Sequence, residues 1–161
     1  TLTVNRPIEF RGTSQSVTIS GSSAVKTGLV LNSTAGGSVV RDLTFANFAN
    51  DAIVLNGNSG TTIAGLVVLN SNYGLTLNGT STGTVVRSNT FTGNATGIRL
   101  VSATGATIGG SLAGQGNTIT SATREGIFAQ GFCTGSRVIG NNVTAKTPYN
   151  ITQSRNLTLV R

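Results

Sequence analysis

The chain has 161 residues, enough for one domain, and its 11 Lys and Arg against 4 Asp and Glu give a formal net charge of +7. Because it has no histidine and only one cysteine, Cys133, it cannot form an internal disulfide, a Ser-His-Asp triad, a Cys-His nucleophile pair or a histidine-based metal site. No apolar run approaches the roughly 18 residues of a transmembrane helix, so no membrane span is predicted.

The composition favours short strands. Hydrophobic residues make up 37% of the chain and charged residues only 9%, and Gly, Ser, Thr and Asn are abundant among the rest. Val, Ile and Leu recur in short runs that are bounded by turn-forming residues, which is the signal of β-strands. We therefore expect an ordered all-β protein.

The predicted strands keep a common step along the chain. Near the N-terminus, Ile8/Phe10 and Val17/Ile19 form an early coil with a weak register. The first strand of each later repeat has inward-facing positions at Leu29/Leu31, Ile53/Leu55, Leu75/Leu77, Ile98/Leu100, Ile127/Ala129 and Ile151/Gln153. A second series is Val40, Ile63, Val86, Ile108, Val138 and Leu157, and a third is Phe45, Val68, Phe91, Ile119 and Val143. Within each series the steps are mostly about 22–24 residues, the range of solenoid repeats.

Strands this short cannot bury an apolar face alone. Stacked coils would pair their backbones in parallel at a spacing of about 4.8 Å and bury one continuous apolar column. Because three independent series keep step, the sequence predicts an all-β, single-stranded parallel β-helix, a solenoid of about seven coils.

The turns between the strands carry their own pattern. Asn89, Asn117 and Asn141 each lie two residues before a member of the third series, where an Asn can turn the chain and hydrogen-bond the neighbouring coil. Leu43 and Leu66 hold this position in the preceding coils, so the predicted Asn ladder is partial. Residues 109–116 form a Gly-rich loop that makes one connection six residues longer than its counterpart.

Two segments resemble a known family. Residues 87–100, beginning Arg87-Ser88-Asn89-Thr90-Phe91, and residues 106–119 resemble the right-handed parallel β-helix repeats of the pectate-lyase-like superfamily and of bacterial surface and secreted proteins. The resemblance implies a right-handed coil over most of the chain. That superfamily includes pectin lyases, polygalacturonases, alginate epimerases, phage tailspikes, adhesins and non-catalytic carbohydrate-binding modules, so the fold alone does not decide the activity.

Catalysis by a glycoside hydrolase would require two carboxylates about 5–9.5 Å apart. The four acidic residues, Glu9, Asp42, Asp51 and Glu125, do not share a position on adjacent coils, so neither a catalytic pair nor an acidic calcium cluster is expected. Asp42, which follows Arg41, and Arg87 are the remaining catalytic candidates. No metal and no cofactor are predicted.

Basic and aromatic side chains suggest ligand binding instead. Arg41 and Arg87 hold equivalent positions two coils apart, which places them about 10 Å from one another on one face. Arg99 points outward from a first strand, and Tyr73 directly precedes one. Since a guanidinium binds a carboxylate through two hydrogen bonds and an aromatic ring can stack on a sugar, these four residues form the predicted uronate-binding set. The alternative is a basic surface that is simply solvated.

We therefore expect a non-catalytic extracellular or cell-surface module that binds acidic polysaccharide or an anionic surface, or serves as a scaffold or adhesin. The alternative is a polysaccharide lyase, hydrolase or epimerase, or a fragment of one. Nucleic acid is not an expected partner, because the basic residues are not clustered or interleaved with aromatics. Residues 1–161 are treated as one domain, a section of a longer β-helix, whose exposed strand edges would be covered by flanking domains or self-association.

Overall fold

The computed structural model describes residues 1–151 and 154–161, and over these residues the only regular helix is one short 3-10 turn, η1 (Ser33–Ala35). Gln153, which was expected to point inward, lies outside the described residues. The strands pair in parallel with those of the neighbouring coils, which confirms the predicted parallel β-helix.

The strands build three faces. The first face consists of β1 (Leu2–Val4), β4 (Leu29–Leu31), β7 (Asp51–Asn56), β10 (Tyr73–Thr80), β13 (Thr96–Thr104) and the later parts of β15 (Thr118–Phe132) and β17 (Asn142–Arg155). The second face consists of β2 (Glu9–Arg11), β5 (Val39–Arg41), β8 (Thr62–Ala64), β11 (Val85–Arg87), β14 (Thr107–Gly109), β16 (Arg137–Ile139) and β18 (Thr158–Val160). The third face consists of β3 (Thr18–Ser20), β6 (Thr44–Ala46), β9 (Val67–Leu69), β12 (Thr90–Thr92) and the earlier parts of β15 and β17.

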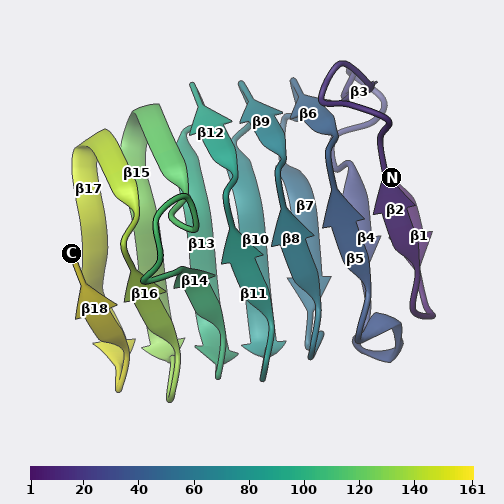
Figure 1. The fold of residues 1–161 in the computed structure, drawn as a ribbon. Coiled ribbons are helices and arrows are strands. Elements are labelled where there is room, and N and C mark those ends of the chain that lie inside the picture. Colours follow the sequence, from purple (N-terminus) through teal and green to yellow (C-terminus); the bar gives the residue numbers. More distant parts are fainter.

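The coil is right-handed and has about seven turns. In Figure 1 the second face lies in front and its strands run upward, after which the chain passes over the top through the third face and descends behind along the first face. Each turn advances toward the left, so the rotation and the advance form a right-handed screw. The second face contains seven strands, one for each coil.

One apolar column fills the interior. Leu77, Val86 and Phe91, one residue from each series, belong to a single buried cluster and are at most 1% exposed. Pairing across coils aligns Val40 with Ile63 and Phe45 with Val68, as the repeat step predicted. The early coil is also confirmed, because Phe10 pairs with Val40 and Ile19 with Phe45.

The last coil departs from the predicted register. Leu159, not Leu157, pairs with Val138, so the expected second-series position was two residues too early. Tyr149, not Ile151, pairs with Ile127, and the ladder between β15 and β17 contains several register shifts. These bulges absorb a difference in length between the two coils, which a fixed repeat step cannot reveal.

The Asn ladder is present and is buried at its centre. The side-chain oxygen of Asn117 accepts hydrogen bonds from the backbone N–H and the side-chain amide of Asn89, at 3.1 and 2.9 Å. Asn141 does the same for Asn117 one coil later, at 3.0 and 2.8 Å. Leu43 and Leu66 are buried in the preceding coils, so the ladder is partial as expected.

Candidate functional site

The predicted ligand-binding residues lie on two opposite faces. Arg41 and Arg87 share one outward row of the second face, with Ala64 between them, as the repeat predicted. Tyr73 and Arg99 lie on the first face, in β10 and β13. Figure 1 places these two strands behind β11 and β14, so the structure does not bring the four residues into one site.

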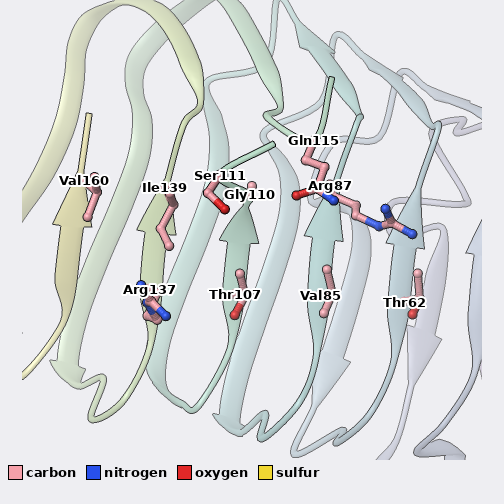
Figure 2. A pocket seen from close by; sticks show the side chains of 11 residues that line it. Thr62, Val85, Arg87, Thr107, Gly110, Ser111, Gln115, Arg137, Ile139 and Val160 are labelled. Atoms are coloured by element: carbon pink, nitrogen blue, oxygen red, sulfur yellow. The ribbon is translucent and has the colours of Figure 1, made fainter. Parts of the chain in front are cut away.

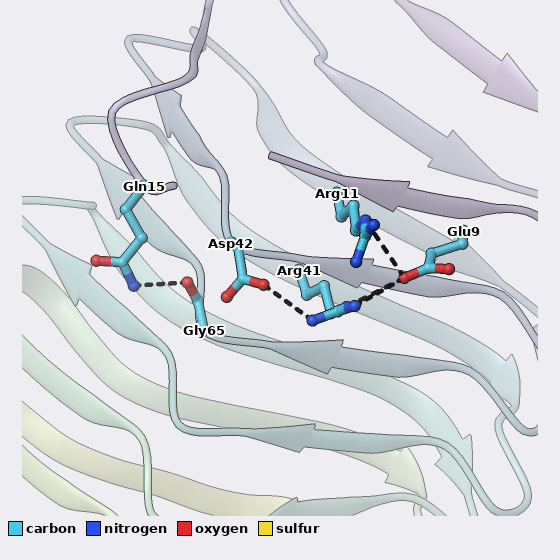
Figure 3. A network of polar contacts seen from close by, with 6 residues as sticks. All are labelled: Glu9, Arg11, Gln15, Arg41, Asp42 and Gly65. Carbon is cyan, nitrogen blue, oxygen red and sulfur yellow. Dashed lines mark hydrogen bonds and ion pairs between the residues drawn. The ribbon is translucent and has the colours of Figure 1, made fainter. Parts of the chain in front are cut away.

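Arg41 is already engaged by carboxylates (Figure 3). Its guanidinium lies 2.9 Å from Glu9 Oε1 and 3.2 Å from Asp42 Oδ2. The hydrogen bond to Glu9 raises the pKa of Arg41. A ligand carboxylate would have to displace Glu9 or Asp42 to reach this side chain, so Arg41 is poorly placed for binding.

The same contact bears on catalysis by Asp42. Glu9 and Asp42 are both bound to the Arg41 guanidinium. Asp42 Oδ2 is therefore occupied by an ion pair at 3.2 Å, and a substrate would have to displace Arg41 to reach that oxygen.

A groove on the second face collects the remaining basic groups (Figure 2). It has a volume of about 550 Å³ and runs over β8, β11, β14, β16 and β18. One wall is formed by the loop of residues 109–116, through Ser111 and Gln115. Its lining residues are Thr62, Val85, Arg87, Thr107, Gly109, Gly110, Ser111, Gln115, Arg137, Ile139 and Val160.

Two guanidinium groups in this groove are free. Neither Arg87 nor Arg137 forms an ion pair or a side-chain hydrogen bond with the residues that the structure describes, and both are exposed. Figure 2 shows Ser111 between the two side chains. None of the residues described along the groove is acidic, so the charge of both guanidinium groups is uncompensated there.

Sequence analysis did not single out Arg137. The signal was present, because Arg137 directly precedes Val138 of the second series and must therefore point outward by strand alternation. Pairing places it beside Thr107, which in turn pairs with Val85. Arg137 and Arg87 therefore line the same groove two rungs apart, and Figure 2 shows the Arg87 guanidinium extending toward the strand of Thr62, away from Arg137.

The first face holds a cluster of aromatic and basic side chains. The guanidinium carbon of Arg99 lies 3.9 Å from the centre of the Tyr73 ring, and that of Arg124 lies 5.3 Å from it. Arg99 Nε is buried without a hydrogen-bond partner in the described part of the chain. Arg99 pairs in register with Phe128, and Thr76 beneath them is completely buried although it points outward.

The two carboxylates of the first face belong to coils that are three rungs apart. Asp51, Tyr73, Thr96 and Glu125 follow one another in register. Three rungs separate the backbones of Asp51 and Glu125 by about 14 Å, whereas the carboxyl groups of a glycosidase pair lie about 5–9.5 Å apart. Glu125 accepts a hydrogen bond from Thr96 at 2.8 Å, and Asp51 accepts one from Thr76.

Comparisons with known proteins identify a family and a fold. A family model described as "Periplasmic copper-binding protein (NosD)" matches residues 9–159. No curated protein matches the sequence. Among solved structures, the catalytic domain of a GH87 alpha-1,3-glucanase variant in complex with tetrasaccharides is similar, with a TM-score of 0.54 and 15% identity. The match covers 85% of this chain and 33% of that domain, so the chain spans about a third of its length. None of the helices in the described residues could span a membrane.

Proposed function

The chain belongs to the NosD family of parallel β-helix proteins, and on that premise we propose that it is a non-catalytic module that works outside the cytoplasm and binds anionic polysaccharide. The binding site is the groove on the second face, with Arg87 and Arg137 as the groups that hold ligand carboxylates. The family is described as periplasmic, which supports a location where such polymers occur.

The observation that carries this proposal is the pair of unpaired guanidinium groups in a groove without acidic residues. A guanidinium binds a carboxylate through two parallel hydrogen bonds, and Arg is suited to this role at partly exposed sites. Thr62, Thr107, Ser111 and Gln115 add hydroxyl and amide groups that can bind sugar hydroxyls. The volume of about 550 Å³ is within the range of small-ligand sites.

Three further observations support polymer binding rather than turnover. The groove is an open strip across several coils, so a chain can enter and leave at its ends. Its described lining includes no carboxylate that could transfer a proton. The formal net charge of +7 attracts polyanions over a distance, and salt screens this attraction.

Copper does not fit the residues of this chain, although the family is described as copper-binding. Copper sites use thiolate, thioether or imidazole ligands, and the chain has no Met, no His and one Cys. Cys133 is completely buried, and desolvation raises the pKa of its thiol, which disfavours the thiolate that a metal needs. Among the described residues, no three of His, Cys, Asp and Glu come together.

We expect copper to leave the protein unchanged. Titration with Cu(II), and with Cu(I) under reducing conditions, should give no saturable heat of binding in calorimetry. It should not raise the melting temperature either, because only a ligand that binds the native state stabilises it. The Cys133→Ser variant is the control for the thiol. Stoichiometric binding that this variant abolishes would contradict the argument from burial.

Removing both groove guanidinium groups should abolish most of the binding. In the R87A/R137A variant we expect the affinity for polygalacturonate at low salt to fall by at least about 100-fold, since hydrogen bonds to charged groups contribute about 1.5–3 kcal/mol each and two guanidinium groups are removed. The measurement is retention on immobilised polygalacturonate at increasing salt. The matched control is the R6A/K26A variant, which loses the same charge from two exposed residues outside the groove.

Equal losses of affinity in the two double variants would mean that only net charge matters, and would overturn the groove as the binding site.

Turnover is tested on the same polymers with a spectrophotometric lyase assay and a reducing-sugar assay. We expect none. Turnover that Asp42→Ala abolishes would overturn the non-catalytic role.

A further inference from the structure

We propose that the first face carries a second site for the same class of ligand, so that one protein molecule can hold two anionic polysaccharide chains on opposite sides. The inference rests on the proposed function and extends it from binding to cross-linking. The second site consists of Arg99, stacked on Tyr73, and the pocket beside them.

Arg99 is pre-positioned and lacks an acceptor. Its guanidinium carbon lies over the Tyr73 ring, 3.9 Å from the ring centre, a contact that restrains its orientation. It forms no ion pair or hydrogen bond with the described residues, and only its Nε is buried, so its Nη groups remain accessible. A guanidinium held in one orientation binds a carboxylate with less loss of conformational entropy. The chemistry that fits is therefore a carboxylate.

The adjoining pocket has the groups for a sugar ring. It has a volume of about 160 Å³, sized for one sugar unit, and is lined by Tyr73, Thr96, Arg124, Glu125 and Phe128. Phe128 pairs in register with Arg99 on the next coil and lines the pocket, so its ring offers a stacking surface to a sugar. Glu125 and Thr96, already joined at 2.8 Å, can hydrogen-bond sugar hydroxyls.

The charges of the pocket favour a uronate over a neutral sugar. Arg99 and Arg124 carry two positive charges, Glu125 lies 4.0 Å from Arg124, and Asp51 is hydrogen-bonded to Thr76, the register partner of Arg99. Neither carboxylate forms an ion pair with Arg99 in the described part of the chain, so the Arg99 charge is open to a ligand. Because the groove has two unpaired guanidinium groups and this site has one, we expect the first-face site to be the weaker of the two.

The positions of the sites make the molecule bivalent. The groove crosses β11 and β14 in front, whereas Arg99 and Phe128 belong to β13 and β15 behind, with the apolar core between them (Figure 1). A polysaccharide chain that lies along one face of the protein cannot reach the opposite face. Two polysaccharide chains can therefore be bound at once, and one protein molecule can link them.

The test is the stoichiometry of a short acidic oligosaccharide, trigalacturonate, in equilibrium dialysis with the intact chain. We expect two sites in the wild type, one in R99Q and one in R87A/R137A, with maltotriose as the neutral control. Phe128→Leu should weaken the second site at least several-fold without affecting the first. It provides an independent variant if R99Q does not fold, and thermal melting monitors folding in each.

The outcomes separate the two proposals. One wild-type site that R87A/R137A abolishes would overturn the first-face site and leave the groove intact. One wild-type site that only R99Q abolishes would overturn the proposal that the groove binds the ligand. Equal binding of maltotriose would overturn the uronate assignment. A second readout is light scattering with long polygalacturonate, where the wild type should aggregate the polymer and each single-site variant should not.

Discussion

Replacing Asn117 by alanine should lower the free energy of unfolding by at least about 3 kcal/mol, because three buried groups lose a partner and each costs about 1–3 kcal/mol. The Asn117 side chain is completely buried. Its oxygen accepts both the backbone N–H and the side-chain amide of Asn89, and its own amide donates to the Val86 carbonyl at 2.9 Å. Alanine removes these partners.

The measurement is urea unfolding with linear extrapolation, provided that the transition is two-state. The control is Asn50→Ala, since Asn50 is exposed and its side chain forms no hydrogen bond with the described residues. That change should stay within about 0.5 kcal/mol. A loss for Asn117→Ala as small as the control's would show that the ladder contributes little to stability.

Truncating Phe91 to alanine should lower the free energy of unfolding by about 3–5 kcal/mol, the range for replacing a buried Phe by Ala, which leaves a cavity. Phe91 is 1% exposed and lies in β12 between Val68 and Ile119 of the neighbouring coils. The stack cannot close around the gap, because the coil spacing is set by backbone hydrogen bonds on three faces. If Gly74 carried a side chain, its Cβ would lie 2.7 Å from the Phe91 ring, so the ring is tightly enclosed.

Phe132→Ala is the matched control. Phe132 is 60% exposed, and its ring is contacted by the Arg155 guanidinium at 5.6 Å. Its truncation should change stability by less than about 1 kcal/mol, since an exposed cation–π contact contributes about 0.5–1 kcal/mol. Comparable losses at the two positions would mean that the apolar column is not the main source of stability.

Family membership and ligand are determined by different residues of this chain. The residues that make it a β-helix point inward and recur in register, whereas the residues that could bind a ligand point outward and differ from coil to coil. The family's copper-binding description therefore does not transfer with the fold, because copper needs particular outward or accessible donors. Arg, Tyr and hydroxyl groups occupy those positions here.

Where sequence reasoning failed, the cause was a change in length. The repeat step placed Leu157 in the second series, but the ladder between β15 and β17 shifts register and Leu159 takes that position. The repeat length also gave no indication that the loop of residues 109–116 would form one side of a groove lined by Arg87 and Arg137. A loop's path depends on the surface beneath it, which a periodic pattern does not describe.

The sequence by itself determined the interior. Spacings that recur about every 22–24 residues set which side chains face inward, and strand alternation then assigned Arg41, Arg87 and Arg99 to the outside. Only the tertiary structure decided which of these charges is free. Glu9, 32 residues from Arg41 in the chain, neutralises that guanidinium, while Arg87 and Arg137 meet no acid among the described residues and Arg99 lies on Tyr73. Inward positions follow from local periodicity, but the partner of a long, flexible surface side chain depends on which coils and loops the fold brings beside it.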